Sequence, residues 1–258
     1  MNQSLKLTAI ALIVATCAQT ASAQMQGNPD GWQTSVGAGV VYGPRSLGSK
    51  KTHVLPVPNF DVRYKDWFFA APLQGIGVQT KLDGFELSSA IAPDFNGRDP
   101  KAGPRYANLK KISMAPALRL RAAYEIGDFT TEAVVSSRLA SSGKNGTTLE
   151  LEEGYELYAA AKTLVTVGAN ARFMNGTFAK NLVSISDADA AASGLPVYRA
   201  KSGILDAGVF AQVVYPVSDH WTLFTKVSLT SLEGSARKSP LVERRTSPGI
   251  LAFANYTF

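Results

Sequence analysis

The stretch Gly249-Ile-Leu-Ala-Phe-Ala-Asn-Tyr-Thr-Phe258 decides the fold. Its residues alternate in character with a period of two, as the side chains of a β-strand do. One face carries Ile250, Ala252, Ala254, Tyr256 and Phe258. The other carries Asn255 and Thr257 together with Leu251 and Phe253. A strand with an apolar outer face and a partly polar inner face is typical of transmembrane β-barrels.

The aromatic pair Tyr256 and Phe258 carries a second signal. Terminal strands that end in Phe resemble the assembly signal of bacterial outer-membrane barrels, so this pair is the predicted assembly signal. In a closed barrel the last strand pairs with the first, which satisfies the edges of both. The alternative is the buried final strand of a soluble sandwich.

The amino-terminal residues predict export. Lys6 precedes an apolar run over residues 7–18, and Ala21-Ser-Ala23 has the small residues of a cleavage site. We therefore expect a cleaved signal peptide at 1–23 and a barrel domain at 24–258. The sole cysteine, Cys17, lies in the signal peptide, so cleavage leaves no thiol chemistry or disulfide. Lipidation at Cys17 is an alternative that Thr16 fits poorly.

Composition narrows the class further. The chain is 45% hydrophobic, yet after the signal peptide no apolar segment approaches the roughly twenty residues of a membrane helix. A membrane location would therefore require a barrel. The net charge of +6 is dispersed along an exported chain, which favours anionic lipid head groups over nucleic acid.

Alternating segments predict about twelve antiparallel strands in an up-and-down transmembrane β-barrel, monomeric in the membrane. The segments are residues 32–42, 54–64, 67–71, 75–81, 85–92, 112–124, 129–138, 148–160, 163–173, 203–215, 221–229 and 249–258. The section 67–92 also fits two longer strands. Pro56 and Pro58 should weaken the second strand near one end.

Connections of two lengths predict the orientation. Short turns, among them one at 161–162, alternate with longer charged loops, as periplasmic turns and external loops do in outer-membrane barrels. Aromatic residues beside the short turns predict a girdle at one membrane interface. They are Tyr64, Trp67, Phe85, Tyr124, Phe129, Tyr215, Trp221 and Phe258. The longest loop should hold a short helix at 187–193, capped by Ser186 or Asp187 and stopped by Gly194.

The inward faces of the strands predict a charge network in the lumen. Its members are Asp61, Arg63, Arg119, Arg121, Glu132, Arg138, Glu150, Glu152, Glu156, Arg172, Asp206 and Lys226. Opposite charges alternate across neighbouring strands and would largely fill a narrow barrel. We favour a charge-paired plug over a lining that selects a small solute. Glu153 would face lipid, so a bulge near Glu152 and Glu153 is expected.

The predicted external loops are basic, which suits the phosphates of lipopolysaccharide, although the charges could equally serve solubility alone. The residues are Arg45, Lys50, Lys51, Lys110, Lys111, Arg237, Lys238, Arg244 and Arg245.

Several short patterns, in order along nearly the whole mature chain, resemble the MipA/OmpV family of outer-membrane proteins. They are Gly39-Val-Val-Tyr-Gly-Pro-Arg-Ser-Leu-Gly-Ser49, Val54-Leu-Pro-Val-Pro58, Trp67-Phe-Phe-Ala70, Ala191-Ala-Ser-Gly-Leu-Pro-Val-Tyr198, Ser218-Asp-His-Trp-Thr222 and Lys238-Ser-Pro-Leu-Val242. The resemblance implies a barrel that acts as a scaffold linking a murein transglycosylase to a murein polymerase. It supplies no catalytic residues.

No catalytic or metal-binding constellation emerges from the sequence. The predicted topology puts His53 and His220 on opposite sides of the membrane, so they cannot share a metal or a relay. Gly37-Ala-Gly39 lacks the helix that a phosphate loop needs. We therefore predict no enzyme, no cofactor and no metal. The resemblance implies a scaffold for murein-processing enzymes, and a narrow solute channel or a surface adhesin are the alternatives.

Overall fold

The computed structural model describes residues 31–160 and 163–258. The predicted signal peptide at 1–23, with Cys17, and the predicted turn at 161–162 lie outside the described residues.

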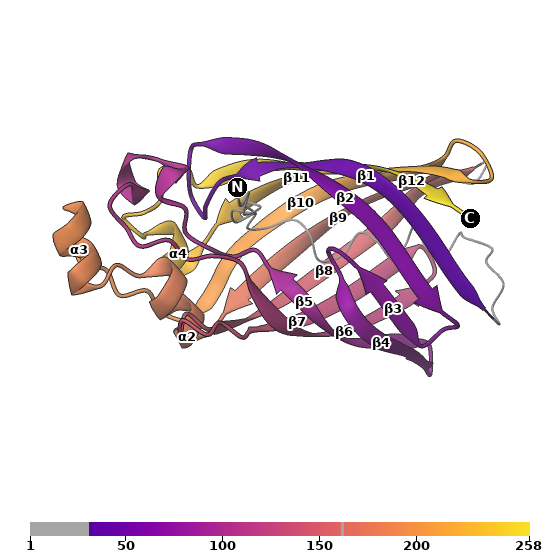
Figure 1. Ribbon diagram of the computed structural model, residues 1–258, viewed down its shortest axis with the longest axis horizontal. Coiled ribbons are helices and arrows are strands. Elements are labelled where there is room, and N and C mark those ends of the chain that lie inside the picture. The colour runs from indigo at the N-terminus through magenta and orange to yellow at the C-terminus, as the bar shows by residue number, and fades with distance from the viewer. Residues whose placement is uncertain (1–30, 161–162) are drawn as a thin grey trace, which may run out of the picture.

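Twelve antiparallel strands, each paired with its neighbours in sequence, form a closed barrel (Figure 1). The strands are β1 (Trp32–Pro44), β2 (Thr52–Tyr64), β3 (Phe68–Ala71), β4 (Gly75–Leu82), β5 (Phe85–Asp94), β6 (Ala115–Ile126), β7 (Phe129–Arg138), β8 (Gly146–Ala160), β9 (Thr163–Met174), β10 (Gly203–Pro216), β11 (Trp221–Leu232) and β12 (Thr246–Thr257). The twelve-strand prediction is confirmed, with three strands rather than two in the uncertain section 67–92.

The pairing of β1 with β12 closes the wall. Its register joins Ser35 to Thr257 and runs to Tyr42 and Ile250. The period-two reading of the last strand is confirmed, because Leu251 is 1% exposed inside whereas Ile250 is 38% exposed outside. The strand begins at Thr246, earlier than predicted.

Strand β3 has only four residues, so it pairs with β2 over Val62, Arg63 and Tyr64 alone. The rest of β2 therefore has a ladder with β1 on one side only. Lys65 N donates to Gly31 O at 3.2 Å, which makes the odd-numbered residues of β2 the ones that hydrogen-bond β1. Pro56 and Pro58 consequently face the unpaired edge, where a missing N–H removes no ladder bond.

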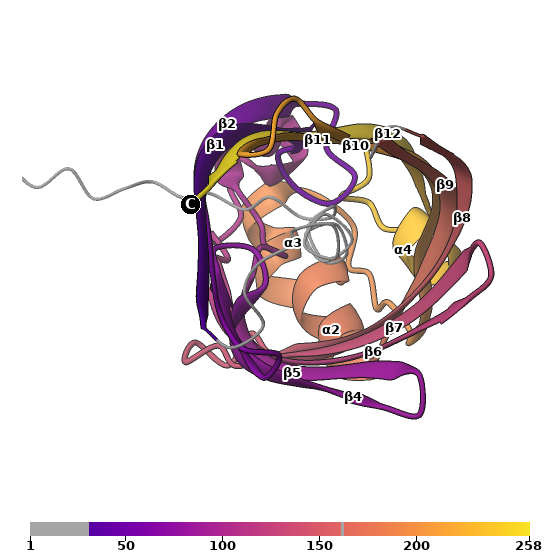
Figure 2. The same ribbon diagram turned by 90° about the vertical axis from the view of Figure 1, so that its right-hand side faces the viewer.

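The five longer connections gather at one end of the barrel. Together they form the loop cap, which we define as residues 45–51, 95–114, 139–145, 175–202 and 233–245. It contains the short helices η1 (Pro100–Ala102), η2 (Pro104–Tyr106), α2 (Gly176–Phe178), η3 (Ala179–Val183), α3 (Asp187–Ser193) and α4 (Gly234–Arg237). Viewed from the opposite end, α2, α3 and α4 lie within the outline of the barrel (Figure 2).

The predicted helix at 187–193 is confirmed as α3. Ser186 caps it, Asp189 completes a capping box, and Gly194 ends it in a left-handed conformation with φ 73°.

The opposite end, the turn end, carries the short turns and the aromatic girdle. Ring pairs there include Trp32 with Tyr64 at 4.7 Å and Phe129 with Tyr155 at 4.9 Å. One end of the barrel is thus covered by long loops with short helices, whereas the other end carries only short turns and aromatic side chains.

Two sequence predictions need correction. No register shift occurs at Glu152 or Glu153, and the irregularity in β8 lies between Glu156 and Tyr158. Glu153 instead faces outward and accepts a hydrogen bond from Thr131 Oγ1 at 2.5 Å. It lies two residues from the girdle residue Tyr155, where a carboxylate costs less than at mid-bilayer. Residues 112–114 belong to the loop cap, because β6 begins at Ala115.

Barrel closure should depend on the small residue Gly39. A Cβ there would lie 2.2 Å from Phe253 Cδ1, so Gly39→Val should destabilise the β1–β12 junction by about 1–3 kcal/mol. Refolding in detergent, followed by the electrophoretic shift of the folded barrel, measures this. Gly43→Ala is the control, since a Cβ at Gly43 meets nothing within 4 Å. Equal folding of both variants would contradict the packing argument.

Candidate functional site

The lumen contains the predicted charge network. Opposite charges meet within β2 at Arg63–Asp61 (2.9 Å), between adjacent strands at Arg121–Glu132 (2.7 Å), Arg121–Glu86 (2.8 Å) and Arg172–Asp206, and between β7 and β5 at Arg138–Asp94 (3.3 Å). The sequence did not single out Glu86 and Asp94, although each has inward parity on β5. In the Arg138–Asp94 and Arg172–Asp206 pairs both partners are buried, so removal of either partner would leave an uncompensated charge.

The ion pair that spans the most strands joins β11 to β8. Lys226 Nζ on β11 lies 3.0 Å from both carboxylate oxygens of Glu152 on β8. The same ammonium lies 3.7 Å from the centre of the Phe210 ring, in cation–π geometry. This contact ties together strands that are three apart around the barrel.

Three predicted network members form no ion pair within the part of the chain that the structure describes. Arg119 donates to the Leu73 carbonyl at 3.1 Å, and Glu150 accepts from Asn170 Nδ2 at 3.3 Å. Glu156 lines the opening at the turn end. The network therefore contains more than simple charge pairs.

A cavity of about 500 Å³, the turn-end cup, occupies the lumen beside the short turns. Its wall carries six carboxylates, which are Glu86, Glu125, Asp128, Glu132, Glu152 and Glu156. Lys81 and Arg121 are the basic residues of the same wall. Above the cup, buried Arg138, Arg172 and Asp206 fill the lumen toward the cap.

The loop cap has its own apolar interior, which the sequence reading missed. One cluster contains Phe178, Leu182 and Val183, and a second contains Tyr106 and Ile185. Tyr106 is 1% exposed and donates its hydroxyl to the Leu47 carbonyl at 2.7 Å. The large apolar residues within these otherwise polar loops were the sequence feature that could have predicted this core.

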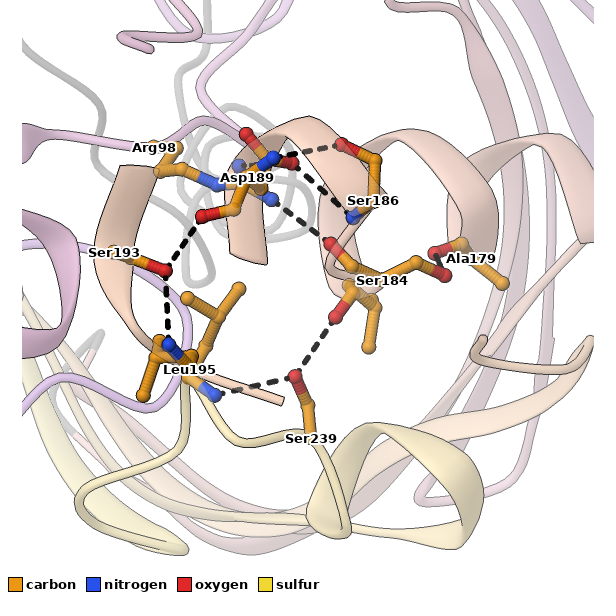
Figure 3. A network of polar contacts seen from close by, with 10 residues as sticks. Arg98, Ala179, Ser184, Ser186, Asp189, Ser193, Leu195 and Ser239 are labelled. Atoms are coloured by element: carbon orange, nitrogen blue, oxygen red, sulfur yellow. Dashed lines mark hydrogen bonds and ion pairs between the residues drawn. The ribbon is translucent and has the colours of Figure 1, made fainter. Parts of the chain in front are cut away.

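A buried arginine connects the layers of the cap (Figure 3). Arg98 is 4% exposed; its guanidinium lies 3.3 Å from Asp189 and donates to the Ser184 carbonyl at 3.1 Å. Nearby, Ser239 Oγ donates to the Val183 carbonyl at 2.8 Å. Burial raises the pKa of Asp189, but Arg98 and the hydrogen bonds from Ser186 outweigh it and hold that pKa below its ordinary value.

Most of the predicted basic loop residues face solvent. The exposed ones are Lys50, Lys51, Lys110, Lys111, Arg237, Lys238, Arg244 and Arg245. Arg45 is the exception, since it is half-buried and pairs with Asp99 at 3.0 Å. Arg237 also approaches Glu233, at 3.6 Å.

Metal chemistry finds no support in the described part of the chain. His53 begins β2 at the cap and His220 lies in a turn at the opposite end, as predicted. Across residues 31–160 and 163–258, no group of three His, Cys, Asp or Glu could hold a metal ion. Within those same residues, no helix has the length and apolarity to cross a membrane.

Comparison with known proteins gives one family and a set of distant folds. The sequence model of the family described as MltA-interacting protein MipA matches residues 36–258. No curated protein matches the chain.

Among solved structures, an outer membrane channel from Pseudomonas putida F1 is 10% identical, with a TM-score of 0.44 over 91% of this chain and 98% of its own. The NanC porin is 8% identical, with a TM-score of 0.41 over 86% of this chain and 99% of its own. Similarity this distant carries no argument about activity.

The Arg98–Asp189 contact should hold the cap closed. Asp189→Asn should increase opening of the loop 175–202 roughly tenfold, about 1.4 kcal/mol, because Arg98 loses its charged partner. Limited trypsin digestion of the folded barrel measures this opening. Asp187→Asn is the matched control, because the Asp187–Arg199 pair is about 80% exposed.

Protonation of Asp189 at low pH should open the loop 175–202 in the same way as Asp189→Asn. Since the pKa of Asp189 is lowered on folding, its stabilisation is present above the unfolded value of about 3.9 and is lost as pH falls through the folded value. Asp189→Asn should flatten this acid dependence of cleavage. Unchanged acid dependence in that variant would assign the effect to other carboxylates.

Proposed function

Because the chain belongs to the MltA-interacting protein MipA family, we propose that it is an outer-membrane scaffold that docks murein-processing enzymes at its turn end. In this proposal the turn end faces the periplasm and the loop cap faces outward. The apolar outer wall and the girdle support the membrane location.

A ring of aspartates at the turn end is the observation that carries the docking proposal. Each of the four described turns at that end presents one exposed aspartate, namely Asp66, Asp83, Asp128 and Asp219. Lys65 stands beside Asp66, but the four described turns taken together carry more negative than positive side chains. A rim with this excess attracts a partner with a basic surface and steers its approach. Murein transglycosylase and murein polymerase are the partners that the family resemblance implies.

The runner-up, a small-solute channel, draws support from the turn-end cup. It requires a path through the lumen, however, and the buried Arg138, Arg172 and Asp206 stand between the cup and a cap with its own apolar core. The scaffold proposal therefore includes a closed lumen.

The exposed basic residues of the cap favour contact with lipopolysaccharide phosphates, which makes the cap a second partner surface.

Site-specific photocrosslinkers at Asp66 and Asp128 should capture a murein-processing enzyme in intact envelopes. Reversal of the rim charge by Asp66→Lys with Asp83→Lys should lower capture from the crosslinker at position 128 about tenfold, because attraction becomes repulsion. Asp187→Lys reverses an exposed charge in the cap and should leave capture unchanged.

Purified protein in planar bilayers should show no steady conductance. Steady open-channel currents without a captured partner would favour the channel.

Membrane assembly should depend on Phe258. Its backbone N donates to Thr34 O at 3.2 Å, and its ring packs edge-on against Tyr256 at 5.2 Å. Phe258→Asp keeps the backbone contact and puts a charge into the girdle, so it should divert the chain to periplasmic proteolysis. Thr246→Asp, at the other end of β12, should assemble normally, and normal assembly of both variants would count against the assembly-signal proposal.

Orientation can be tested separately on intact cells. An amine-reactive reagent that does not cross membranes should reach Lys180, Lys201 and Lys238 in the cap and spare Lys65 at the turn end. All four side chains are exposed in the folded barrel, so burial cannot account for a difference. The opposite labelling pattern would invert the proposed topology.

A further inference from the structure

The turn-end cup has more negative charge than the lumen needs for its own pairing. Arg121 pairs with Glu86 and Glu132, and Lys226 reaches across to Glu152. The remaining carboxylates of the wall, Glu125, Asp128 and Glu156, have no ion pair in the described part of the chain. They lie nearest the opening, where a cation entering from the turn end would first meet them.

A buried oxygen deeper in the cup also lacks a partner. Glu132 is 5% exposed and accepts from Arg121 Nε through Oε2. Its other oxygen, Oε1, has no hydrogen-bond partner among residues 31–160 and 163–258. A buried carboxylate oxygen left unpaired costs free energy that a bound donor would recover.

The spacing of the carboxylates indicates the kind of cation. Glu152 and Glu156 are four residues apart on one strand, about 13 Å at the usual rise. The absence of a metal-holding group among the described His, Cys, Asp and Glu residues means that these carboxylates do not converge on one point. An extended ligand with several separated positive charges fits such a wall better than a single divalent ion.

The apolar part of the cup suits the chain between such charges. Leu164 and Phe210 contribute apolar surface to the same cavity. The Phe210 ring already receives the ammonium of Lys226, so this part of the cup accommodates an alkylammonium group in cation–π geometry. A volume of about 500 Å³ lies within the usual range of small-ligand pockets.

We propose that the turn-end cup is a binding site for a linear polyamine. Protonated amines at its two ends contact the mouth carboxylates Glu125 and Glu156 and the inner carboxylates Glu132 and Glu152, while the methylene chain lies along Leu164 and Phe210. Asp128 belongs to both the rim and the wall of the cup, but the four carboxylates proposed to contact the polyamine are glutamates outside the rim. Binding can therefore fail while docking succeeds, and the reverse.

The test uses the purified full-length barrel in detergent and spermidine as the probe, followed by isothermal titration calorimetry. Saturable binding with one site per barrel is expected, and it should weaken as salt rises. Glu156→Gln should weaken spermidine binding three- to tenfold, and Glu132→Gln about tenfold. Glu153→Gln is the matched control, because Glu153 faces outward on the same strand only three residues from Glu156.

Competing explanations give different results. Mg²⁺ at the same ionic strength should displace little spermidine if the charges of the site are spread along the wall. Complete displacement by Mg²⁺, equal weakening in Glu153→Gln, or no spermidine binding at millimolar concentration would overturn the proposal. Since Glu132→Gln removes a buried ion-pair partner and can disturb folding, Glu156→Gln at the solvent-facing mouth decides the outcome if that variant misfolds.

Discussion

The whole structure depends on the requirement that a barrel wall satisfies its backbone hydrogen bonds within itself. In lipid no water is available for unpaired N–H and C=O groups, so the first and last strands must meet. The β1–β12 ladder does this over eight residue pairs, with Gly37 and Gly39 leaving room inside for Asn255 and Phe253. The short strand β3 is an exception, because it leaves most of one edge of β2 without a paired strand. Prolines stand on the edge of β2 that β3 leaves unpaired, and the apolar Leu55 and Val57 pack inward behind it.

Closure of the wall creates a second problem, because a barrel of this width has an interior to fill. This chain fills it asymmetrically. Strands β9 to β12 contribute an apolar luminal layer with Leu164, Val214, Phe224 and Phe253, whereas β5 to β8 contribute carboxylates and arginines. Lys226 bridges the two halves because its stem crosses apolar surface and its ammonium reaches Glu152. The excess of carboxylates on one side is what leaves a charged cup instead of a uniformly packed core.

Sequence periodicity predicted the wall well, because side-chain alternation is a local property. It placed Glu132, Arg138 and Asp206 inside without any knowledge of their partners. It could not predict that Lys226 meets Glu152, since contacts across the lumen depend on how far the strands are staggered around the closed barrel.

The prediction from side-chain alternation was also wrong at Glu153. A bulge was expected there to keep a carboxylate out of lipid, but proximity to the interface and a bond from Thr131 make the regular ladder tolerable. The loop cap was the largest omission. Its core is assembled from apolar residues of four separate loops, and no period connects Tyr106 with Ile185 along the chain.

The short hairpins at the turn end bear on the proposed docking function because they hold their side chains in place. The turn-end aspartates sit in hairpins held by the wall on both sides, and three of these hairpins contain a residue in the left-handed region, namely Lys65 and Asp83 with φ of 49° and Gly127 with φ of 57°. Groups already held in place lose little conformational entropy when a partner binds. In the proposed scaffold the rim would present the same pattern of charge whatever occupies the lumen, and the cap held by Arg98 lies at the other end of the barrel. Aspartates held in short hairpins at one end thus support the scaffold proposal over the channel.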